Sequence, residues 1–513
     1  MASSKSSSML RSQCAALFGP RLLLPRTAVS FRGSLYLPLS CRSFNSSHRS
    51  RERNSGPALP KPRLDYRSII QNSTYKSHNT FNRRANLPVN TIPDIVKLHA
   101  SQTELNARIG HLKAERSKLG DDVQKGGDSK AAAVEGAKIL KEEIRELEAK
   151  LSKVDEELLA RALLLPNDTH LDVPLGPEPA AKVLATHGPN PLPVTPARHH
   201  VSINQSIPFM DLEGGVMSSG SSWYFLKDIG AFLELALINY SMSVAIKHGF
   251  VPIMTPDVVK EDVATRCGFQ PRDEAGAAPS QNYYLNRTKD EPQLVLAGTA
   301  EIPLGAMFAG KIFEKKSLPQ KVVGLGRAFR AEAGARGADT RGLYRVHQFS
   351  KVEMFVVCDG DVHKSNEMME EMKKIQTEIF ENLGLTFRIL DMPTEELGAS
   401  AYRKYDMEAW MPGRGGWGEI SSLSNCTDYQ ARRLHIRHAL PPASPTTSLP
   451  EGRSTPSTAF AHTLNGTAAA IPRLIVALVE NGVQLDGKKI VGLTLPKTLR
   501  PFWLGSGEGI HWA

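Results

Sequence analysis

Acidic residues are missing from the first 51 residues of the chain, which hold eight basic residues and 13 serines. The formal charge of +10 is therefore concentrated at one end, because residues 1–60 carry +8 and the rest only about +2. Apolar runs in this leader, such as Leu22–Leu24, are too short to span a membrane. The composition is typical of an organellar import sequence. We expect a mitochondrial transit peptide over residues 1–55, a mitochondrial matrix location and no membrane partner; the alternative is a basic tail on a cytosolic protein.

Cysteine is also scarce. Of five cysteines, two lie in the leader, and the remaining three are Cys267, Cys358 and Cys426. Their spacing matches no set of metal ligands, and the mitochondrial matrix would keep them reduced. The sequence therefore predicts neither a zinc site nor a disulfide framework.

A heptad pattern follows a polar, irregular stretch over residues 60–90. Four leucines recur at intervals of seven residues: Leu98, Leu105, Leu112 and Leu119. After Gly126-Gly127, apolar residues between 140 and 158 are spaced alternately by four and three. This pattern predicts two antiparallel helices of about 30 residues each, roughly 45 Å long, within a domain over residues 60–170.

Helical hairpins of this kind most often serve oligomerisation, and a solvated charged face would show the same alternation of Lys, Arg and Glu. Pro166 ends the second helix. Residues 171–198 are rich in proline and predict a linker. A catalytic domain is then expected over residues 199–513, with a flexible insertion at residues 441–457.

The stretch from Gly324 to Glu353 carries the strongest chemical signal. Arg330 and Glu332 stand two apart, so an extended strand would point both into one site. A glycine-rich turn then adds three arginines: Arg336, Arg341 and Arg345. The chain returns on a second strand with Phe349 available for stacking. Cations, an acid and an aromatic ring suit a nucleotide, although an arginine-rich hairpin alone is more often a generic anion-binding patch.

Phe329-Arg330-Ala331-Glu332 followed by GLYRVHQFSKVE resembles motif 2 of class II aminoacyl-tRNA synthetases, in its seryl-tRNA synthetase form. The apolar helix expected over 229–248 and the strand ending at Pro256 resemble motif 1, which implies a homodimer. Thr463–Gly482, with Arg473, resembles motif 3. The resemblance implies an α+β fold: an antiparallel sheet flanked by helices, preceded by a helical hairpin that binds tRNA. It extends over about residues 64–505.

The same resemblance assigns roles in ATP binding. Arg330 would hold the α-phosphate, Glu332 the adenine edge and Arg345 the outer phosphates. Phe349 and Arg473 would enclose the adenine ring. A metal would be shared with the phosphates, and its two implied ligands are Glu419 and Ser422. A carboxylate and a hydroxyl suit Mg²⁺, and Arg330, Glu419 and Arg473 would supply the catalytic charge stabilisation.

For serine, Glu353 would accept the hydroxyl, while Thr299 and Glu301 would face the ammonium group. Asn465 and Thr467 would close the small pocket. Gly298 stands where the family usually has proline, which leaves the Thr-x-Glu residues in register. The implied reaction joins serine to ATP as seryl adenylate and transfers the seryl group to tRNA(Ser).

Two other functions remain open from the sequence. A paralogue could activate an amino acid and charge a carrier protein, but such relatives lack the helical arm. A non-catalytic RNA-binding protein could also be built on the same fold. Loss of the motif residues would favour the second, and none is lost.

Overall fold

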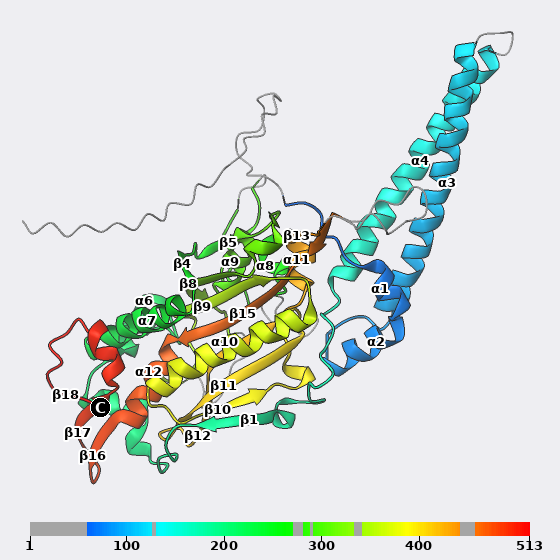
Figure 1. Ribbon diagram of the computed structural model, residues 1–513. Coiled ribbons are helices and arrows are strands. Elements are labelled where there is room, and N and C mark those ends of the chain that lie inside the picture. Colours follow the sequence, from blue (N-terminus) through cyan, green and yellow to red (C-terminus); the bar gives the residue numbers. More distant parts are fainter. Residues whose placement is uncertain (1–58, 126–129, 270–280, 288–290, 333–340, 442–456) are drawn as a thin grey trace, which may run out of the picture. The chain divides into compact units, whose positions relative to one another are not determined.

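The computed structural model describes residues 59–125, 130–269, 281–287, 291–332, 341–441 and 457–513. Its centre is an eight-stranded sheet (Figure 1). The strands run in the spatial order β1 (Lys182–His187), β10 (Phe387–Asp391), β11 (Arg403–Met411), β12 (Gly416–Asn425), β15 (His462–Ala470), β9 (Gln348–Cys358), β8 (Gln320–Phe329) and β4 (Val251–Met254). Every neighbouring pair is antiparallel except β4 and β8, which are parallel. The expected α+β fold with an antiparallel sheet is confirmed.

Strand β9 shows how the sequence divides the two faces of this sheet. Side chains alternate between faces along a strand. Val352, Met354 and Val356 belong to one buried apolar cluster, whereas Phe355 and Val357 belong to another. The first cluster includes three long helices, namely α7 (Ile229–Lys247), α10 (Val362–Asn382) and α12 (Ile471–Gly482). The second includes the shorter helices α8 (Glu261–Arg266), α9 (Glu301–Met307) and α11 (Tyr429–Leu434).

Smaller elements complete the body. The remaining strands are β2 (Met210–Asp211), β3 (Phe225–Leu226), β5 (Val258–Lys260), β6 (Leu294–Leu296), β7 (Ile312–Phe313), β13 (Arg437–Ala439), β14 (Thr458–Phe460), β16 (Val483–Asp486), β17 (Lys489–Leu495) and β18 (Ile510–Trp512). The remaining helices are α5 (His200–Ser206) and α6 (Leu212–Ser219), with 3₁₀ turns η1 (Glu178–Ala180), η2 (Pro196–Arg198), η3 (Lys315–Ser317), η5 (Thr394–Glu396) and η6 (Lys497–Phe502).

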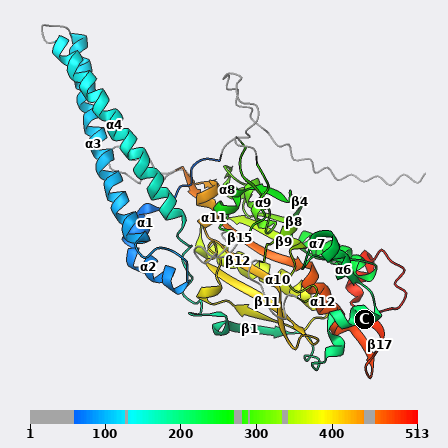
Figure 2. The ribbon, with the colours of Figure 1, turned by 180° about the vertical axis from the view of Figure 1, so that it is seen from behind.

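The predicted helical hairpin is present as α3 (Thr91–Lys125) and α4 (Lys130–Leu163), seen side by side in Figures 1 and 2. Ile109, Leu112 and Ile144 are buried between the two helices, as the heptad pattern requires. The expectation of an irregular stretch over residues 60–90 is wrong. Two short polar helices form there, α1 (Tyr66–Gln71) and α2 (Ser73–Asn82).

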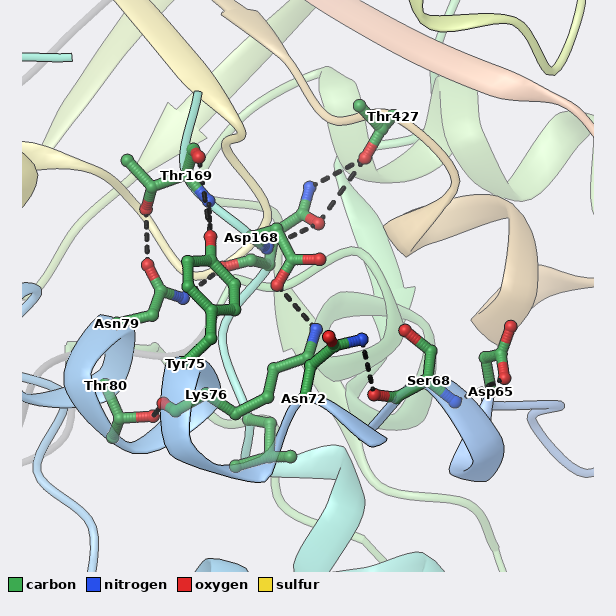
Figure 3. A network of polar contacts seen from close by, with 12 residues as sticks. Asp65, Ser68, Asn72, Tyr75, Lys76, Asn79, Thr80, Asp168, Thr169 and Thr427 are labelled. Atoms are coloured by element: carbon green, nitrogen blue, oxygen red, sulfur yellow. Dashed lines mark hydrogen bonds and ion pairs between the residues drawn. The ribbon is translucent and has the colours of Figure 1, made fainter. Parts of the chain in front are cut away.

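Polar contacts hold α2 to the segment after α4 (Figure 3). Thr169 Oγ1 donates to Asn79 Oδ1 at 2.6 Å, and Lys76 forms an ion pair with Asp168. Because these contacts are long-range and polar, they leave no apolar periodicity from which α2 could be predicted. Helix α1 begins with a local cap, in which Asp65 accepts the Ser68 N–H at 2.9 Å.

A buried arginine extends this junction to the body. Arg83 is 2% exposed and donates to the main-chain oxygens of Gly398 and Ala401, the latter at 2.9 Å. The side-chain nitrogen Nδ2 of Asn167 also donates to the main-chain oxygens of Ser400 and Cys426, at 2.9 and 2.8 Å. The base of the arm is therefore tied to two loops of the catalytic body.

The expectation of a linker over residues 171–198 is also wrong. Strand β1 lies within it and pairs with β10 at the edge of the main sheet. The prolines flank the KVLATH segment without interrupting it, so its N–H groups are free to bond to the neighbouring strand. The catalytic sheet therefore begins before residue 199.

Helix α7 matches the apolar helix expected over 229–248. Within the described ranges it is the one helix long and apolar enough to cross a membrane, and half of that stretch is buried. The buried core helix of a soluble protein passes the same test. Three expectations lie outside the described residues: the transit peptide, Arg336 and nearly all of the insertion over 441–457, of which residues 442–456 are not described.

Candidate active site

Eight of the twelve predicted site residues line one cavity, which encloses about 550 Å³ including space open to solvent. They are Arg330, Glu332, Arg345, Phe349, Glu419, Ser422, Thr467 and Arg473. Residues more than 140 positions apart in the sequence thus meet at one place.

Strand β9 supplies one wall. Phe349 and Glu353 lie four positions apart, so they share the face of β9 that carries Phe355. Lys351 lies between them on the same face and also lines the cavity. The strand thus presents an aromatic ring, a cation and an acid in sequence.

The prediction that Arg330 and Glu332 share one face of an extended strand is wrong, although both residues line the cavity. Strand β8 ends at Phe329, and Glu332 has a φ of +47°, outside extended geometry. The chain therefore turns at this point. The turn, not strand alternation, brings the two side chains to the same cavity.

A β-bulge explains why Glu419 and Ser422 meet in the cavity. Residues three apart on a regular strand point to opposite faces. Here Met407 pairs with Ser421 and the next residue of β11, Glu408, pairs with Glu419, so the register shifts by one residue. The extra residue in β12 restores a common face to the two predicted metal ligands.

Helix α12 brings Arg473 to the same cavity, with Pro472 in its first turn as expected for a helix start. Arg473 Nη1 lies 3.1 Å from Glu419 Oε2 and also donates to the Glu419 main-chain oxygen at 3.0 Å. Its Nε donates to the Tyr344 main-chain oxygen at 3.3 Å, and its guanidinium lies 5.1 Å from the Tyr344 ring centre.

Neighbouring charges keep Glu419 and Arg473 ionised. Burial acts to raise the pKa of Glu419, but Arg473, Lys404 and Arg330 outweigh it and hold the pKa below its ordinary value. Burial likewise acts to lower the pKa of Arg473, and Glu419 more than compensates. The Glu419 side chain is still 43% exposed, toward the cavity. It therefore remains available to a ligand.

Arg330 occupies the other side of the cavity. Its guanidinium lies 5.4 Å from the centre of the Phe349 ring, and its Nε donates to the Gly298 main-chain oxygen at 3.4 Å. Burial lowers the pKa of Arg330, with Glu419 and Glu332 acting in the opposite direction. An arginine already stacked on this ring indicates that the Phe349 face suits a flat or cationic group.

The four remaining predicted residues form a polar network beside the cavity, in which Thr299, Glu353 and Asn465 are buried and Glu301 is partly exposed. Glu353 Oε2 accepts from Lys351 Nζ at 2.7 Å and from Thr467 Oγ1 at 3.3 Å. Two residues before Thr467 on β15, Asn465 Nδ2 donates to Glu301 Oε1 at 2.9 Å. Lys351 and Thr467 also line the cavity, so they connect the network to it.

Glu301 is a perturbed acid of the network. Removal from bulk water and the neighbouring Glu353 together raise its pKa to about 7, against the lowering effect of Lys351. Thr299 Oγ1 accepts the Glu301 N–H at 3.3 Å, so Thr299 also supports the start of α9. The Glu301 carboxyl is therefore only partly ionised near neutral pH, and a cationic group placed beside it would favour the ionised form.

Sequence reasoning missed four side chains. Lys351 could have been found, because it lies two residues before Glu353 on one strand. Tyr344 lies within the motif that drew attention to the hairpin. Gln430 gave no sequence signal: helix α11 brings its Nε2 to 2.6 Å from Glu301 Oε1. Arg414, 4.1 Å from the Tyr344 ring centre, was likewise undetectable.

Comparison with known proteins places this geometry in a family. Residues 283–482 match the tRNA synthetase class II core domain (G, H, P, S and T), and residues 64–169 match the seryl-tRNA synthetase N-terminal domain. A serine–tRNA ligase from Treponema denticola is 38% identical over 444 residues, covering 86% of this chain and 98% of the relative. The chain belongs to the seryl-tRNA synthetase family. As a family member it is a class II serine–tRNA ligase.

Two further members of the seryl-tRNA synthetase family are also similar to this chain. The mitochondrial serine–tRNA ligase of Schizosaccharomyces pombe is 39% identical over 469 residues, which is 90% of this chain and 92% of that protein. The crystal structure of seryl-tRNA synthetase from Pyrococcus horikoshii complexed with ATP superimposes with a TM-score of 0.74 at 30% identity, covering 86% and 98% of the two chains.

Proposed function

We propose that this seryl-tRNA synthetase acts in mitochondrial translation, activating serine with ATP at the described cavity and transferring it to tRNA(Ser). One observation carries the assignment of the site. A cavity lined by Arg330, Arg345 and Arg473 adjoins an acidic network around Glu301 and Glu353. Cations for a polyphosphate thus lie beside acids for an amino acid's ammonium and hydroxyl groups.

The arginines and Phe349 are assigned to ATP. Arg330 holds the α-phosphate, Arg345 the outer phosphates, and Arg473 lies over the adenine ring opposite Phe349. Arg345 lies 3.6 Å from Glu332, which takes the adenine edge. Guanidinium groups suit phosphates because their donors form a planar fork. The likeness to a structure containing ATP supports this assignment.

The polar network is assigned to serine. Glu353 accepts the serine hydroxyl, with Thr467 beside it, and Glu301 faces the ammonium group with Asn465 and Thr299. Glu353 is 1% exposed and Thr467 3% exposed, so groups left unpaired there would be costly. Alanine, which lacks the hydroxyl, is therefore rejected strongly. Threonine is excluded by volume.

A magnesium ion fits the residues that the bulge brings together. Glu419 is ionised, its side chain faces the cavity, and Ser422 adds a hydroxyl oxygen. Mg²⁺ prefers oxygen ligands and usually retains waters and substrate phosphates. When bound there, it would neutralise charge on the phosphates of ATP.

The chemistry itself needs positioning more than proton transfer. The serine carboxylate is ionised at neutral pH, attacks the α-phosphorus, and pyrophosphate leaves. Arg330 stabilises charge at the α-phosphate and Arg473 at the leaving group. No general base is required in this step, so Glu332 is assigned to adenine recognition. A terminal ribose hydroxyl of tRNA then attacks the carbonyl carbon of the seryl adenylate, so that the seryl ester forms and AMP leaves.

The α3–α4 arm is assigned to tRNA. Its described exposed faces carry basic side chains, including Lys97, Arg108, Lys113 and Lys141, although Arg108 and Lys113 form ion pairs with glutamates of α4. Such a surface would contact RNA backbone and shape rather than base edges. The match to the seryl-tRNA synthetase N-terminal domain supports this role over oligomerisation.

A homodimer is proposed around α7 and β4. Leu235 and Ile246 of α7 are 43% and 45% exposed, and Val251 and Met254 of β4 are 57% and 76% exposed. Strand β4 is also an edge strand of the main sheet. Exposed apolar side chains beside an unpaired strand edge are typical of a protein–protein interface.

Mitochondrial location rests on the leader and on mitochondrial relatives from S. pombe, mouse and budding yeast. Bacterial relatives are equally similar, so the leader carries the argument. A C-terminal fluorescent fusion with and without residues 1–55 tests it. Mitochondrial signal that depends on the leader is expected, and cytosolic signal from both forms would contradict it.

Charging of tRNA tests the proposed function. The protein should attach serine, but not alanine or threonine, to a mitochondrial tRNA(Ser) transcript in the presence of ATP and Mg²⁺. A tRNA of another amino-acid identity is the matched control. Equal charging of both RNAs, or transfer of serine to neither, would overturn the proposal.

A further inference from the structure

A buried histidine lies directly behind the nucleotide cavity, outside every motif considered above. His200, the first residue of α5, is 3% exposed. Its Nδ1 lies 2.8 Å from Glu480 Oε1, and its main-chain N–H donates to the same oxygen at 3.1 Å. Glu480 is fully buried in α12, and its other oxygen accepts the Gly413 N–H at 2.8 Å.

The second ring nitrogen of His200 reaches the cavity wall. The Leu343 N–H donates to His200 Nε2 at 3.2 Å. An acceptor nitrogen carries no proton, so the proton of the neutral ring resides on Nδ1 and is donated to Glu480. Leu343, Tyr344 and Arg345 all line the cavity. A chain of hydrogen bonds thus runs from Glu480 to the main chain of the phosphate-binding segment.

Gly342 makes this contact possible. It has a φ of +78°, and a Cβ built on it would lie 2.0 Å from His200 Nε2. Only a residue without a side chain allows the ring to approach the Leu343 N–H so closely. The glycine and the histidine therefore act as one unit.

Helix α12 fixes the same segment at a second point. Arg473 Nε donates to the Tyr344 main-chain oxygen at 3.3 Å. Arg473 and Glu480 are seven residues apart, about two helical turns, so they lie on one side of α12. One helix therefore holds successive residues of the segment, directly through Arg473 and indirectly through His200.

Metal binding is the alternative role for the cluster of His199, His200 and Glu480. The potential ligand atoms of His199, His200 and Glu480 all lie within 4.8 Å of one another. Both nitrogens of His200 and both carboxylate oxygens of Glu480 are already engaged in hydrogen bonds within the protein. The group is satisfied without an ion and instead serves to hold the main chain.

We propose that His200 is a positioning residue of the nucleotide site: Glu480 fixes the His200 ring, and the ring holds the Leu343 N–H so that Tyr344 and Arg345 face ATP. It touches neither substrate. Its effect falls on ATP and not on serine, because the serine network lies on β9, β15 and α9 and has no described contact with His200. This inference rests on the proposed role of the cavity as the ATP site.

Two substitutions separate the two ring nitrogens. In H200N the amide can take the place of Nδ1 and keep Glu480 partnered, but it cannot reach Leu343. In H200Q the longer side chain can place an acceptor near the position of Nε2. H199N is the matched control, because His199 stacks on His200 with ring centres 4.5 Å apart and contacts neither Glu480 nor Leu343 in the described hydrogen bonds.

Serine-dependent exchange between ATP and pyrophosphate on the full chain is the test, with KM measured for both substrates. H200N should raise KM for ATP about tenfold, in line with loss of one buried hydrogen bond, and change KM for serine less than twofold. H200Q should recover part of the loss, and H199N should match the wild type. G342A should reproduce the H200N defect and add less to it in the H200N background.

Unchanged KM for ATP in H200N would overturn the inference, as would equal rises in KM for ATP and serine. Because H200N keeps the Glu480 bond, it should fold where H200A does not. Exchange by the wild type together with an unaffected H200N would refute the positioning role alone. A wild type without serine-dependent exchange would refute the proposed function and this inference with it.

Discussion

Glu301 is held in the active site at a cost to stability, so replacing it by glutamine should make the protein more stable and less active. Its pKa is raised from 4.5 to about 7, first by removal from water and then by Glu353. Between these two values the folded protein binds a proton that the unfolded chain has released. Stability therefore falls as pH rises from about 4.5 to about 7.

The size of the effect follows from the shift. At about 1.4 kcal/mol per pKa unit, the ionised carboxylate costs up to about 3 kcal/mol above pH 7. Glu301 retains part of its surface exposed, so we expect about 1–3 kcal/mol. Glutamine keeps a carbonyl oxygen for the bonds from Gln430 and Asn465, which are 2.6 and 2.9 Å long in the wild type. It removes only the charge.

Thermal unfolding at pH 5 and pH 8 is the assay. E301Q should melt above the wild type at pH 8, and the difference should shrink at pH 5. E353Q is the matched control, since it removes a charge from the same pocket but leaves the buried Lys351 without its ion pair at 2.7 Å. It should therefore destabilise the protein. E301Q melting at or below the wild type at pH 8 would refute the reasoning.

Three further predictions follow from the site. Because Glu301 must be ionised to face the ammonium group, kcat/KM for serine should fall about tenfold per pH unit below pH 7, while KM for ATP stays constant; parallel changes in both would contradict this. R473K keeps the charge but loses the guanidinium nitrogen that bonds both the side chain and the main-chain oxygen of Glu419, so exchange should fall about 100-fold; near-normal exchange would remove Arg473 from the site. Replacing residues 113–143 by a short turn should leave serine activation within about twofold and abolish tRNA charging, because the described apolar cluster of the distal arm lies between α3 and α4; intact charging would contradict the role of the arm.

Local patterns predicted the long elements well. The heptads predicted the arm and the apolar run over 229–248 predicted α7, since in both cases the buried residues recur in the local sequence. Elements held by distant polar partners were missed. Helix α2 depends on contacts with Asp168 and Thr169, and β1 depends on pairing with β10, about 200 residues later.

The candidate site divides in the same way. The motifs predicted that Arg330, Glu419 and Arg473 would meet, but not how. Arg330 reaches the cavity because the chain turns after β8. Glu419 meets Ser422 because of a β-bulge, which could not be predicted from the sequence pattern. Gln430 and the contact of His200 with Leu343 arise only from packing between distant elements.

Amino-acid-dependent exchange between ATP and pyrophosphate, run without tRNA on the protein lacking residues 1–55, tests the central claim most directly. All twenty amino acids should be compared, with E353Q as the pocket variant. The account predicts exchange with serine alone, strongly reduced in E353Q at unchanged KM for ATP. Exchange with another amino acid, or with none, would contradict the assignment of the cavity and its acidic network to serine activation.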